Sequence, residues 1–599
     1  MKKIWKREEI PVEHTWATED LYASEEAWEQ DLASLAEDKA KFASYAGRLT
    51  ESGETMLEYF TMVEAVSQKI HRIASFCMRK SDEDTRNAHY QALVGKFRSV
   101  AVSIGAVRSF ETPEIMALSD ETLEGYFAQV PGLERYRRAI TNERRMKAHT
   151  LSAAEEKLLA SAGEVTGSPY NVYNMFANAD MSFEDAVDAE GNKHILRQGN
   201  FVSLEESNDR KLRQSAYENM YQSFINFQNT AAGLLNAQHK QLKFQAEARK
   251  HPSSFEAALD RTNVPTSVYL NLIEAVHKNL DKMHRYVRLR KKLLGVEDLH
   301  FYDVYVPMVN GADHEISIEE AKQTVYDALE PMGEEYRAIL KEGFENRWID
   351  VYTNEGKRSG AYSSGAQPHP YVLLNYSGNL KCQFTLAHEM GHALHSYLSA
   401  KDQNPVDANY VIFVAEVAST CNEALLMEYL LGKTTDKKQR ARLINHFLEQ
   451  FKGTLFRQTM FAEFELIMGR LVAEGKTLTA ELLNSEYKKL NELYFGPDMV
   501  VDDYIAAEWA RIPHFYMNYY VFQYATGYSA AIALSRKILS GGEDALKDYL
   551  GFLSGGCSKN PIDLLKGAGV DMTAPEPVDQ AMDLFGELLD EMEKLAEDL

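Results

Sequence analysis

The segment FTLAHEMGHALHSYL, residues 384–398, carries the most informative pattern in this sequence. His388 and His392 are four residues apart, so on a helix their side chains project from one face and can bind one metal ion through imidazole nitrogens. Glu389 follows the first histidine and lies beside the pair, where it can reach a metal-bound water without being a ligand. This H-E-x-x-H spacing is typical of zinc-dependent hydrolases, and it predicts a zinc site with Glu389 as general base.

The residues around the motif favour a helix that follows a β-type segment. Apolar side chains such as Phe384 and Leu394 form a flank that can anchor this helix. Gly391 lies in its middle, where glycine costs about 1 kcal/mol relative to alanine, so we expect a packing reason or a site reason for it. His395 lies close to the ligand face, but its offset fits no three-histidine site. We expect its ring to form a hydrogen bond to a neighbouring element instead.

A catalytic zinc ion usually has three protein ligands and one open position for water. The next helical segment, residues 409–431, carries Glu416, Glu423 and Glu428 in an otherwise apolar sequence. Glu416 and Glu423 share a helical face but lie roughly 10 Å apart along the axis, so only one of them can be a ligand. The apolar neighbours of Glu416 favour it, with Glu423 accepting an N–H from a ligand histidine. The Asn422–Glu423 step, which resembles the ligand step of thermolysin-type enzymes, keeps Glu423 open as the alternative.

Away from the motif, the sequence indicates a mostly helical protein. Apolar residues recur at three- and four-residue spacing through most of the chain, whereas residues 185–201 predict a small hairpin. Residues 296–380 are aromatic and β-branched with interspersed Gly, Pro and Asn, which predicts loops and a small sheet beside the zinc helix. We expect an N-terminal helical domain over 1–195 and a catalytic domain over 196–599.

Composition excludes several classes of protein. The chain has 599 residues, 65 Lys and Arg against 89 Asp and Glu, and a net charge of −24, which disfavours binding to nucleic acid or to an anionic membrane surface. No apolar run approaches the roughly 20 residues that cross a bilayer, and no apolar stretch follows the basic N-terminus as in a signal peptide. The four cysteines lie far apart, as in proteins of a reducing compartment. We therefore expect a cytoplasmic protein.

Several segments together resemble the thimet-oligopeptidase-type zinc peptidases, and within them the oligoendopeptidase F branch. The resemblance spans nearly the whole chain, from HTWATEDLYASEEAWEQDL at 14–32 onward. Its most specific parts are KRSGAYSSG (357–365), PYVLLNYSGN (370–379), FTLAHEMGHALH (384–395), FVAEVAST (413–420) and RIPHFYMNYYVFQYATG (511–527). In that family the glutamate of the FVAEVAS segment is the third zinc ligand, so the resemblance selects Glu416. It also implies a fold of two helical halves that enclose a deep substrate channel.

The same resemblance implies that a late histidine and late tyrosines point at the scissile bond. His514 matches that histidine, although the glycine-rich loop of thimet-type members is absent here. Tyr519, Tyr520, Tyr524 and Tyr528 are all candidates, of which Tyr520 and Tyr528 are favoured. From the residues alone, a histidine among tyrosine hydroxyls is suited to stabilising an oxyanion beside a metal.

These inferences predict a zinc-dependent endopeptidase with one Zn²⁺ per chain, cutting internal bonds of short, unstructured oligopeptides. The strand expected at 371–376 would be an edge strand that pairs with the substrate backbone through the segment containing Tyr371, Leu373 and Asn375. The alternatives are a zinc carboxypeptidase or dipeptidyl carboxypeptidase, and a non-catalytic helical peptide-binding scaffold. The oligomeric state is not indicated by the sequence.

Overall fold

The computed structural model describes residues 4–309, 311 and 315–597, apart from the side chain of Ala153. Helices account for 72% of the chain and strands for 4%, which confirms the mostly helical class. The chain forms two compact units, each assembled from three separate stretches. In unit 1 these stretches are 4–148, 315–429 and 534–569, and in unit 2 they are 149–311, 430–533 and 570–597. The contiguous division at 195 and 196 expected from the sequence does not follow these units and stays a prediction.

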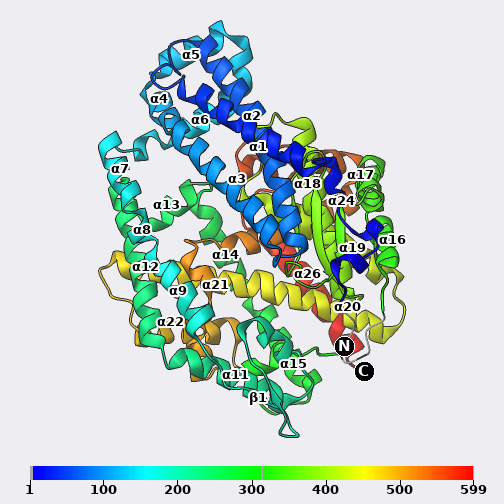
Figure 1. Cartoon of the computed structure of the whole chain (residues 1–599). Coiled ribbons are helices and arrows are strands. Elements are labelled where there is room, and N and C mark those ends of the chain that lie inside the picture. Colours follow the sequence, from blue (N-terminus) through cyan, green and yellow to red (C-terminus); the bar gives the residue numbers. More distant parts are fainter. Residues whose placement is uncertain (1–3, 310, 312–314, 598–599) are drawn as a thin grey trace. The chain divides into compact units, whose positions relative to one another are not determined.

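The described residues of unit 1 form ten complete α-helices and a three-stranded sheet (Figure 1). Its helices are α1 (Glu25–Ala43), α2 (Gly53–Glu83), α3 (Ala88–Val107), α4 (Glu111–Ala117), α5 (Asp120–Gln129), α6 (Arg137–Arg145), α16 (Ile318–Ala328), α17 (Gly333–Glu345), α18 (Leu380–Asp402) and α25 (Pro561–Gly567). Almost all of α19 (Ile412–Lys433) belongs to it as well. Helix α24 (Phe522–Leu553) runs from unit 2 into unit 1 and is interrupted at Gly542.

Unit 2 is helical apart from two pairs of short strands. Its helices are α7 (Ala153–Ser161), α8 (Gly163–Thr166), α9 (Ser168–Met175), α10 (Phe201–Glu205), α11 (Arg210–Ile225), α12 (Gln228–Ala248), α13 (Ser254–Asp260), α14 (Thr266–Lys278), α15 (Leu280–Leu294), α20 (Lys437–Gln450), α21 (Arg457–Ala473), α22 (Ala480–Phe495), α23 (Asp503–Ala506) and α26 (Glu576–Leu595). Strands β1 (Ala186–Val187) and β2 (Lys193–His194) pair antiparallel, as the expected hairpin requires. Strands β3 (Leu299–His300) and β7 (Met499–Val500) pair in parallel.

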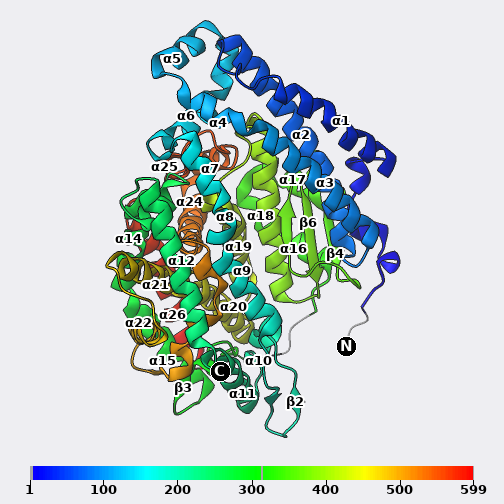
Figure 2. The same ribbon diagram turned by 60° about the vertical axis from the view of Figure 1, so that its left-hand side comes forward.

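The sheet of unit 1 has the order β4 (Ile349–Tyr352), β6 (Tyr371–Tyr376), β5 (Tyr362–Ser364). Strand β6 is central, parallel to β4 and antiparallel to β5. Its apolar run is buried on both faces, as expected when helices cover both sides of a sheet. Tyr371 and Leu373 belong to the core formed with α1, α2 and α3. Helix α18 packs against β6 and β5, beside the sheet in Figure 2.

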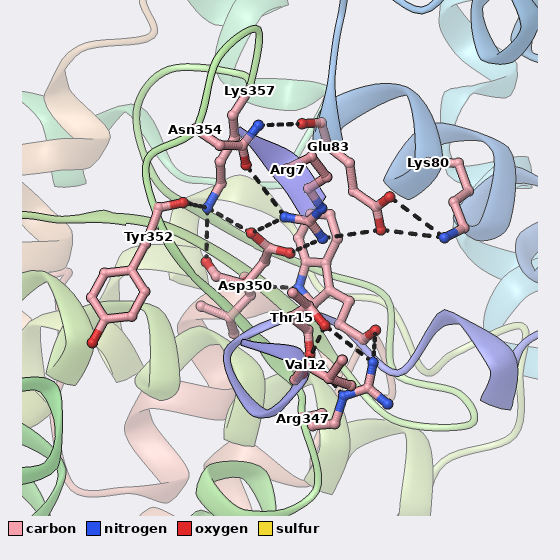
Figure 3. A network of polar contacts seen from close by, with 12 residues as sticks. Arg7, Val12, Thr15, Lys80, Glu83, Arg347, Asp350, Tyr352, Asn354 and Lys357 are labelled. Carbon is pink, nitrogen blue, oxygen red and sulfur yellow. Dashed lines mark hydrogen bonds and ion pairs between the residues drawn. The ribbon is translucent and has the colours of Figure 1, made fainter. Parts of the chain in front are cut away.

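A buried polar cluster ties the N-terminal segment to this sheet (Figure 3). Asp350 of β4 is fully buried and pairs with Lys357 at 2.7 Å and with Arg7. Although burial acts to raise it, these two cations hold the pKa of Asp350 below its ordinary value. Glu83, at the end of α2, joins the cluster through Arg7 at 3.3 Å. The cluster therefore joins the N-terminal segment, α2 and β4 within unit 1.

No helix among the described residues is both long enough and apolar enough to cross a membrane.

Candidate metal centre

Helix α18 presents the two histidines of the motif on one face. Three residues separate it from β6. The Asn379 side chain accepts the Cys382 N–H and caps its first turn. The rings of His388 and His392 lie 4.8 Å apart between centroids and meet nearly at right angles. Their side chains are 26% and 17% exposed, so both histidines are only partly buried.

Helix α19 supplies a carboxylate that faces both rings. The Oε2 atom of Glu416 lies 3.3 Å from Nε2 of His388 and 3.6 Å from Nε2 of His392. Ligand atoms of all three residues lie within 4.8 Å of one another, which is the arrangement that a single ion can gather. The Ser419 hydroxyl, one turn further along α19, donates to the Glu416 backbone carbonyl oxygen at 3.0 Å and lies 3.3 Å from Oε2 of the same residue. The structure therefore brings together the three residues that the sequence favoured.

The second glutamate of α19 lies behind the first histidine. Nδ1–H of His388 donates to Oε1 of Glu423 at 2.6 Å. When the ring is neutral, a proton on Nδ1 leaves the lone pair of His388 on Nε2, the atom that faces Glu416. This is the usual arrangement of a carboxylate that supports a metal-binding histidine, and it matches the expectation for Glu423.

Close packing of α18 on α19 explains the glycine in the motif. A Cβ atom on Gly391 would lie 2.6 Å from Cα of Ser419 and 2.8 Å from the carbonyl oxygen of Ala418. Buried Asn422 adds a polar contact between the helices by donating to the carbonyl oxygen of Ala387 at 3.2 Å. The expected packing reason for Gly391 is confirmed, because only a residue without a side chain allows the two backbones to approach so closely. Sequence reasoning had no signal for the parts that Ser419 and Asn422 play.

Glu389 is buried beside the histidines. Among the described residues, its Oε2 atom has no hydrogen-bond partner. Burial raises the pKa of Glu389, although the neighbouring histidines act in the opposite direction. For Glu416 burial also acts upward, but His388 and His392 hold its pKa below the ordinary value. The pKa values of these two carboxyl groups are therefore shifted in opposite directions: Glu416 is kept ionised, whereas Glu389 takes up a proton more readily.

The donor set of this group fits a divalent metal ion. Two imidazole nitrogens and one carboxylate oxygen are the His₂Glu ligands found in catalytic zinc sites. The buried Oε2 atom of Glu389 lies beside these donors and has no hydrogen-bond partner among the described residues. These observations agree with a group built to hold a metal ion and a reacting water.

Comparison with known proteins places the chain in a family. The family profile described as "Peptidase family M3" matches residues 203–584, and a second, "Oligopeptidase F", matches residues 114–183. The chain belongs to peptidase family M3. It is 45% identical to an oligopeptidase, PepF, of Bacillus subtilis over 98% of this chain and 88% of that protein.

Two crystal structures extend the M3 assignment to the fold. A putative peptidase from Chlamydophila abortus is 34% identical, with a TM-score of 0.91 over 99% of this chain and 100% of that one. Oligoendopeptidase-F from Enterococcus faecium is 38% identical, with a TM-score of 0.76 over 96% of this chain and 100% of that one. The resemblance inferred from the motifs is thereby confirmed, and with it the expectation of a metalloendopeptidase.

His395 of this M3 peptidase has no part in the metal group. Its buried ring stacks on Tyr410 with centroids 3.7 Å apart and an interplanar angle of 4°. Burial lowers the pKa of His395 to about 3, so the ring is neutral. The sequence predicted a hydrogen bond from this ring to a neighbouring element. The structure shows stacking on Tyr410, and the Nδ1 atom of His395 has no hydrogen-bond partner among the described residues.

The expectation of an edge strand at 371–376 is wrong. Strand β6 lies between β4 and β5, and β5 pairs with it at Tyr371, Val372 and Leu373, so β6 is not an edge strand. Tyr371 and Leu373 are fully buried, and the Asn375 side chain donates to carbonyl oxygens of Arg358 and Gly360. The outer strands are β4, which is mostly buried, and β5, whose residues are all partly exposed. The apolar run at 371–374 fits a central strand better than an edge strand, because both of its faces are covered.

The late histidine and tyrosines lie in unit 2. The His514 and Tyr520 rings each contact Tyr524 edge-on, at 6.2 and 5.3 Å between centroids, and all three are partly exposed. Tyr519 is buried beside Ser254 and Tyr528 is buried against Phe451. Burial, with a smaller contribution from Arg457, lowers the pKa of His514. The roles expected for His514, Tyr520 and Tyr528 stay predictions, and exposure adds Tyr524 to the strongest candidates.

Proposed function

We propose that this M3 peptidase is a zinc-dependent endopeptidase that hydrolyses internal bonds of short, unstructured oligopeptides. The observation that carries the proposal is the convergence of His388, His392 and Glu416, with Glu423 behind the first histidine and Glu389 beside the group. The names of the relatives, an oligopeptidase and an oligoendopeptidase, support the substrate class. The four cysteines are free, which supports the cytoplasm as its compartment.

His388, His392 and Glu416 would hold the zinc ion. When bound there, zinc lowers the pKa of a coordinated water toward neutrality and polarises the substrate carbonyl. Glu389 would accept the proton of the attacking water and deliver it to the leaving amine. Its raised pKa suits both transfers. The carboxylate accepts the proton from water readily and holds it until the amine departs.

His514, Tyr520 and Tyr528 would stabilise the oxyanion. A neutral imidazole N–H and tyrosine hydroxyls are hydrogen-bond donors suited to the negative charge that develops on the carbonyl oxygen. The partly exposed cluster of His514, Tyr520 and Tyr524 supports the first two of these residues. Burial of Tyr528 against Phe451 makes it the weaker candidate of the set.

The substrate backbone would pair with the outer edge of β5. This strand ends the sheet and packs against α18, the helix that carries His388 and His392. Main-chain pairing along Tyr362–Ser364 would hold an extended peptide beside the motif. The catalytic domain would begin near residue 196, which the family match from residue 203 supports.

End-blocked peptides test the proposal most directly. We expect the zinc-loaded chain to cleave an acetylated, amidated peptide at internal bonds, and a chelator to abolish cleavage until zinc is restored. Mass spectrometry of the products identifies the cut positions. Products that arise only when the C-terminal carboxylate is free would support a carboxypeptidase in place of the endopeptidase, and no cleavage of any peptide would support the scaffold alternative.

A further inference from the structure

A second cluster of metal-binding residues lies in unit 2, outside the α18–α19 group. It consists of His149, His251 and Asp260, which come from the segment before α7, the turn after α12 and the end of α13. One ligand atom from each residue lies within 4.8 Å of the other two, as in the α18–α19 group. All three side chains are partly exposed, so an ion could reach them from solution.

His149 is held in the orientation of a metal-binding histidine. Its Nδ1–H donates to the carbonyl oxygen of Arg249 at 2.8 Å, which leaves the lone pair on Nε2. The Arg249 guanidinium donates in return to the carbonyl oxygen of His149 at 3.3 Å. The same guanidinium makes a two-pronged pair with Glu156 of α7, at 2.7 and 2.8 Å. The ring and the backbone of His149 are therefore both fixed before any ion binds, as in sites where a carbonyl supports the ligand.

His251 and Asp260 are positioned beside it by the α12–α13 turn. The His251 N–H donates to the carbonyl oxygen of Ala246 at 2.9 Å, and its ring stacks on that of His149 at 3.6 Å between centroids. Asp260 ends α13 and has two carboxylate oxygens, so an interaction made by one oxygen leaves the other able to ligate.

We propose that His149, His251 and Asp260 form a second metal site, for Zn²⁺ or a similar divalent transition ion such as Co²⁺ or Ni²⁺. Imidazole nitrogens select these ions over Mg²⁺ and Ca²⁺, which prefer sites made of oxygen atoms alone. Zn–N bonds of 2.0–2.1 Å place tetrahedral ligand atoms roughly 3.3 Å apart, so the His251 ring turns out of its stack on His149, whose own ring stays held by Arg249, and the donors close up on binding. Water completes the coordination.

The bound ion would cross-link segments that are distant in the sequence. It would join the chain just before α7 to the α12–α13 turn, which already share the Arg249–Glu156 pair. An ion that binds the folded chain alone raises its stability by mass action. The second site is therefore structural, and unit 2 should unfold at a higher temperature when it is filled.

Metal stoichiometry of the full-length chain tests the site. The chain is stripped with a chelator, equilibrated with zinc at a buffered micromolar free concentration, and analysed by mass spectrometry of the metal. We expect two equivalents for the wild type and one for the double variant His388→Asn and His392→Asn. We expect one equivalent for His251→Ala and none when all three substitutions are combined. His194→Ala is the matched control, because His194 pairs with Asp188 at 2.9 Å as a histidine–carboxylate pair without a third ligand.

Cobalt provides a second measurement that does not depend on activity. In the His388→Asn and His392→Asn chain, Co²⁺ should give the visible absorption of a site with nitrogen and oxygen ligands, and Asp260→Asn should weaken its binding at least tenfold. Asp260→Asn also replaces His251→Ala if that variant does not fold. A wild-type count of one equivalent, or binding at millimolar metal alone, would overturn the site. So would a count that neither His251→Ala nor Asp260→Asn lowers, whereas peptide cleavage by the one-zinc chain would leave the proposed catalytic function intact.

Discussion

At the scale of single residues, the candidate metal centre depends on which atom each side chain presents. His388 donates from Nδ1 to Glu423, and its Nε2 atom faces Glu416. In water neither ring nitrogen has such a fixed partner. Glu389 and Glu416 belong to the same group of side chains but are shifted in opposite directions. Glu416 is thus suited to binding a cation and Glu389 to accepting a proton. The proposed hydrolysis requires both of these roles.

The first prediction concerns the proposed general base. Glu389→Gln is nearly isosteric, and it should keep stoichiometric zinc because Glu389 is not one of the three facing donors. An amide cannot accept the water's proton, so kcat should fall by about 10²-fold or more. Peptide turnover and metal content are measured on the same preparation. Near-wild-type turnover with full zinc occupancy would falsify the assignment of Glu389.

The second prediction ranks the glutamates of α19. Glu416→Ala removes a facing donor and should abolish tight zinc binding. Glu423→Ala removes only the support of His388 and should weaken binding by roughly 10–100-fold. Competition with a chromogenic chelator measures both affinities, and Glu428→Ala on the same helix is the control expected to bind normally. The reverse ranking of the first two variants would make Glu423 the ligand.

At the scale of elements, the centre depends on how closely α18 and α19 approach. Gly391 permits that approach, and Asn422 bonds across it to Ala387. The helices also have to be held from outside, which the sheet does for α18 through β5 and β6. Because β6 is the central strand of the sheet, it forms a fixed base for α18.

The third prediction follows from the helix contact. Gly391→Ala should force Ser419 and Ala418 away, which displaces Glu416 and weakens zinc binding at least tenfold. It should also lower the unfolding temperature, although alanine is by itself the better helix former by about 1 kcal/mol. Gly95→Ala in the middle of α3 is the control, because its Cβ meets no atom within 4 Å and should raise stability slightly. Calorimetry and metal affinity are measured together, and stabilisation by Gly391→Ala would contradict the close contact.

The fourth prediction concerns a buried acid of unit 2. Burial raises the pKa of Glu465 in α21 to about 8, against the Tyr519 N–H that donates to its Oε1 atom at 2.9 Å. The unfolded chain releases this proton near its ordinary pKa of 4.5, so between that pH and about 8 the unfolded state binds fewer protons than the folded state. Stability linked to Glu465 is therefore complete below pH 4.5 and is lost as pH rises toward 8.

Glu465→Gln mimics the protonated acid and removes this dependence. Its unfolding temperature should match that of the wild type near pH 5 and exceed it by several degrees near pH 8. Calorimetry across this range, with zinc held at saturation, makes the measurement. A difference between the two proteins that stays constant with pH would show that Glu465 is ionised in the folded chain.

At the scale of the whole molecule, two units share one chain, and each is built from stretches far apart in the sequence. The catalytic motif and its glutamates lie in unit 1, whereas His514 and the late tyrosines lie in unit 2. The family resemblance implies an enclosed substrate channel, and substrate size is the most direct test of that expectation.

The fifth prediction is that substrates are limited by size and folding and not by a strict sequence rule. A walled channel admits an extended peptide, whereas a folded domain of roughly 30 Å has its backbone groups already paired. Pairing with β5 would use main-chain hydrogen bonds that every peptide offers, so side-chain selectivity should be broad. Hydrolysis of end-blocked peptides of about 6–15 residues is compared with that of casein and of a folded protein. Rapid cleavage of the intact folded protein would contradict the enclosed site while leaving the zinc chemistry in place.

The sequence by itself determined what depends on neighbours along the chain. A four-residue spacing places His388 and His392 on one face of any helix, and the apolar periodicity predicts a mostly helical protein, because both follow from the local geometry of the backbone. The resemblance then identified Glu416, which spacing on α19 had only favoured.

Only the tertiary structure decided what depends on the approach of separate segments. It placed Glu423 behind His388, showed Gly391 against Ser419, and made β6 a central strand where the sequence had suggested an edge. It also brought His149 beside His251, which no motif connects. The physical reason is the same in each case: strand order and contacts between helices are set by how the elements bury their apolar faces together, and no short stretch of sequence contains that information.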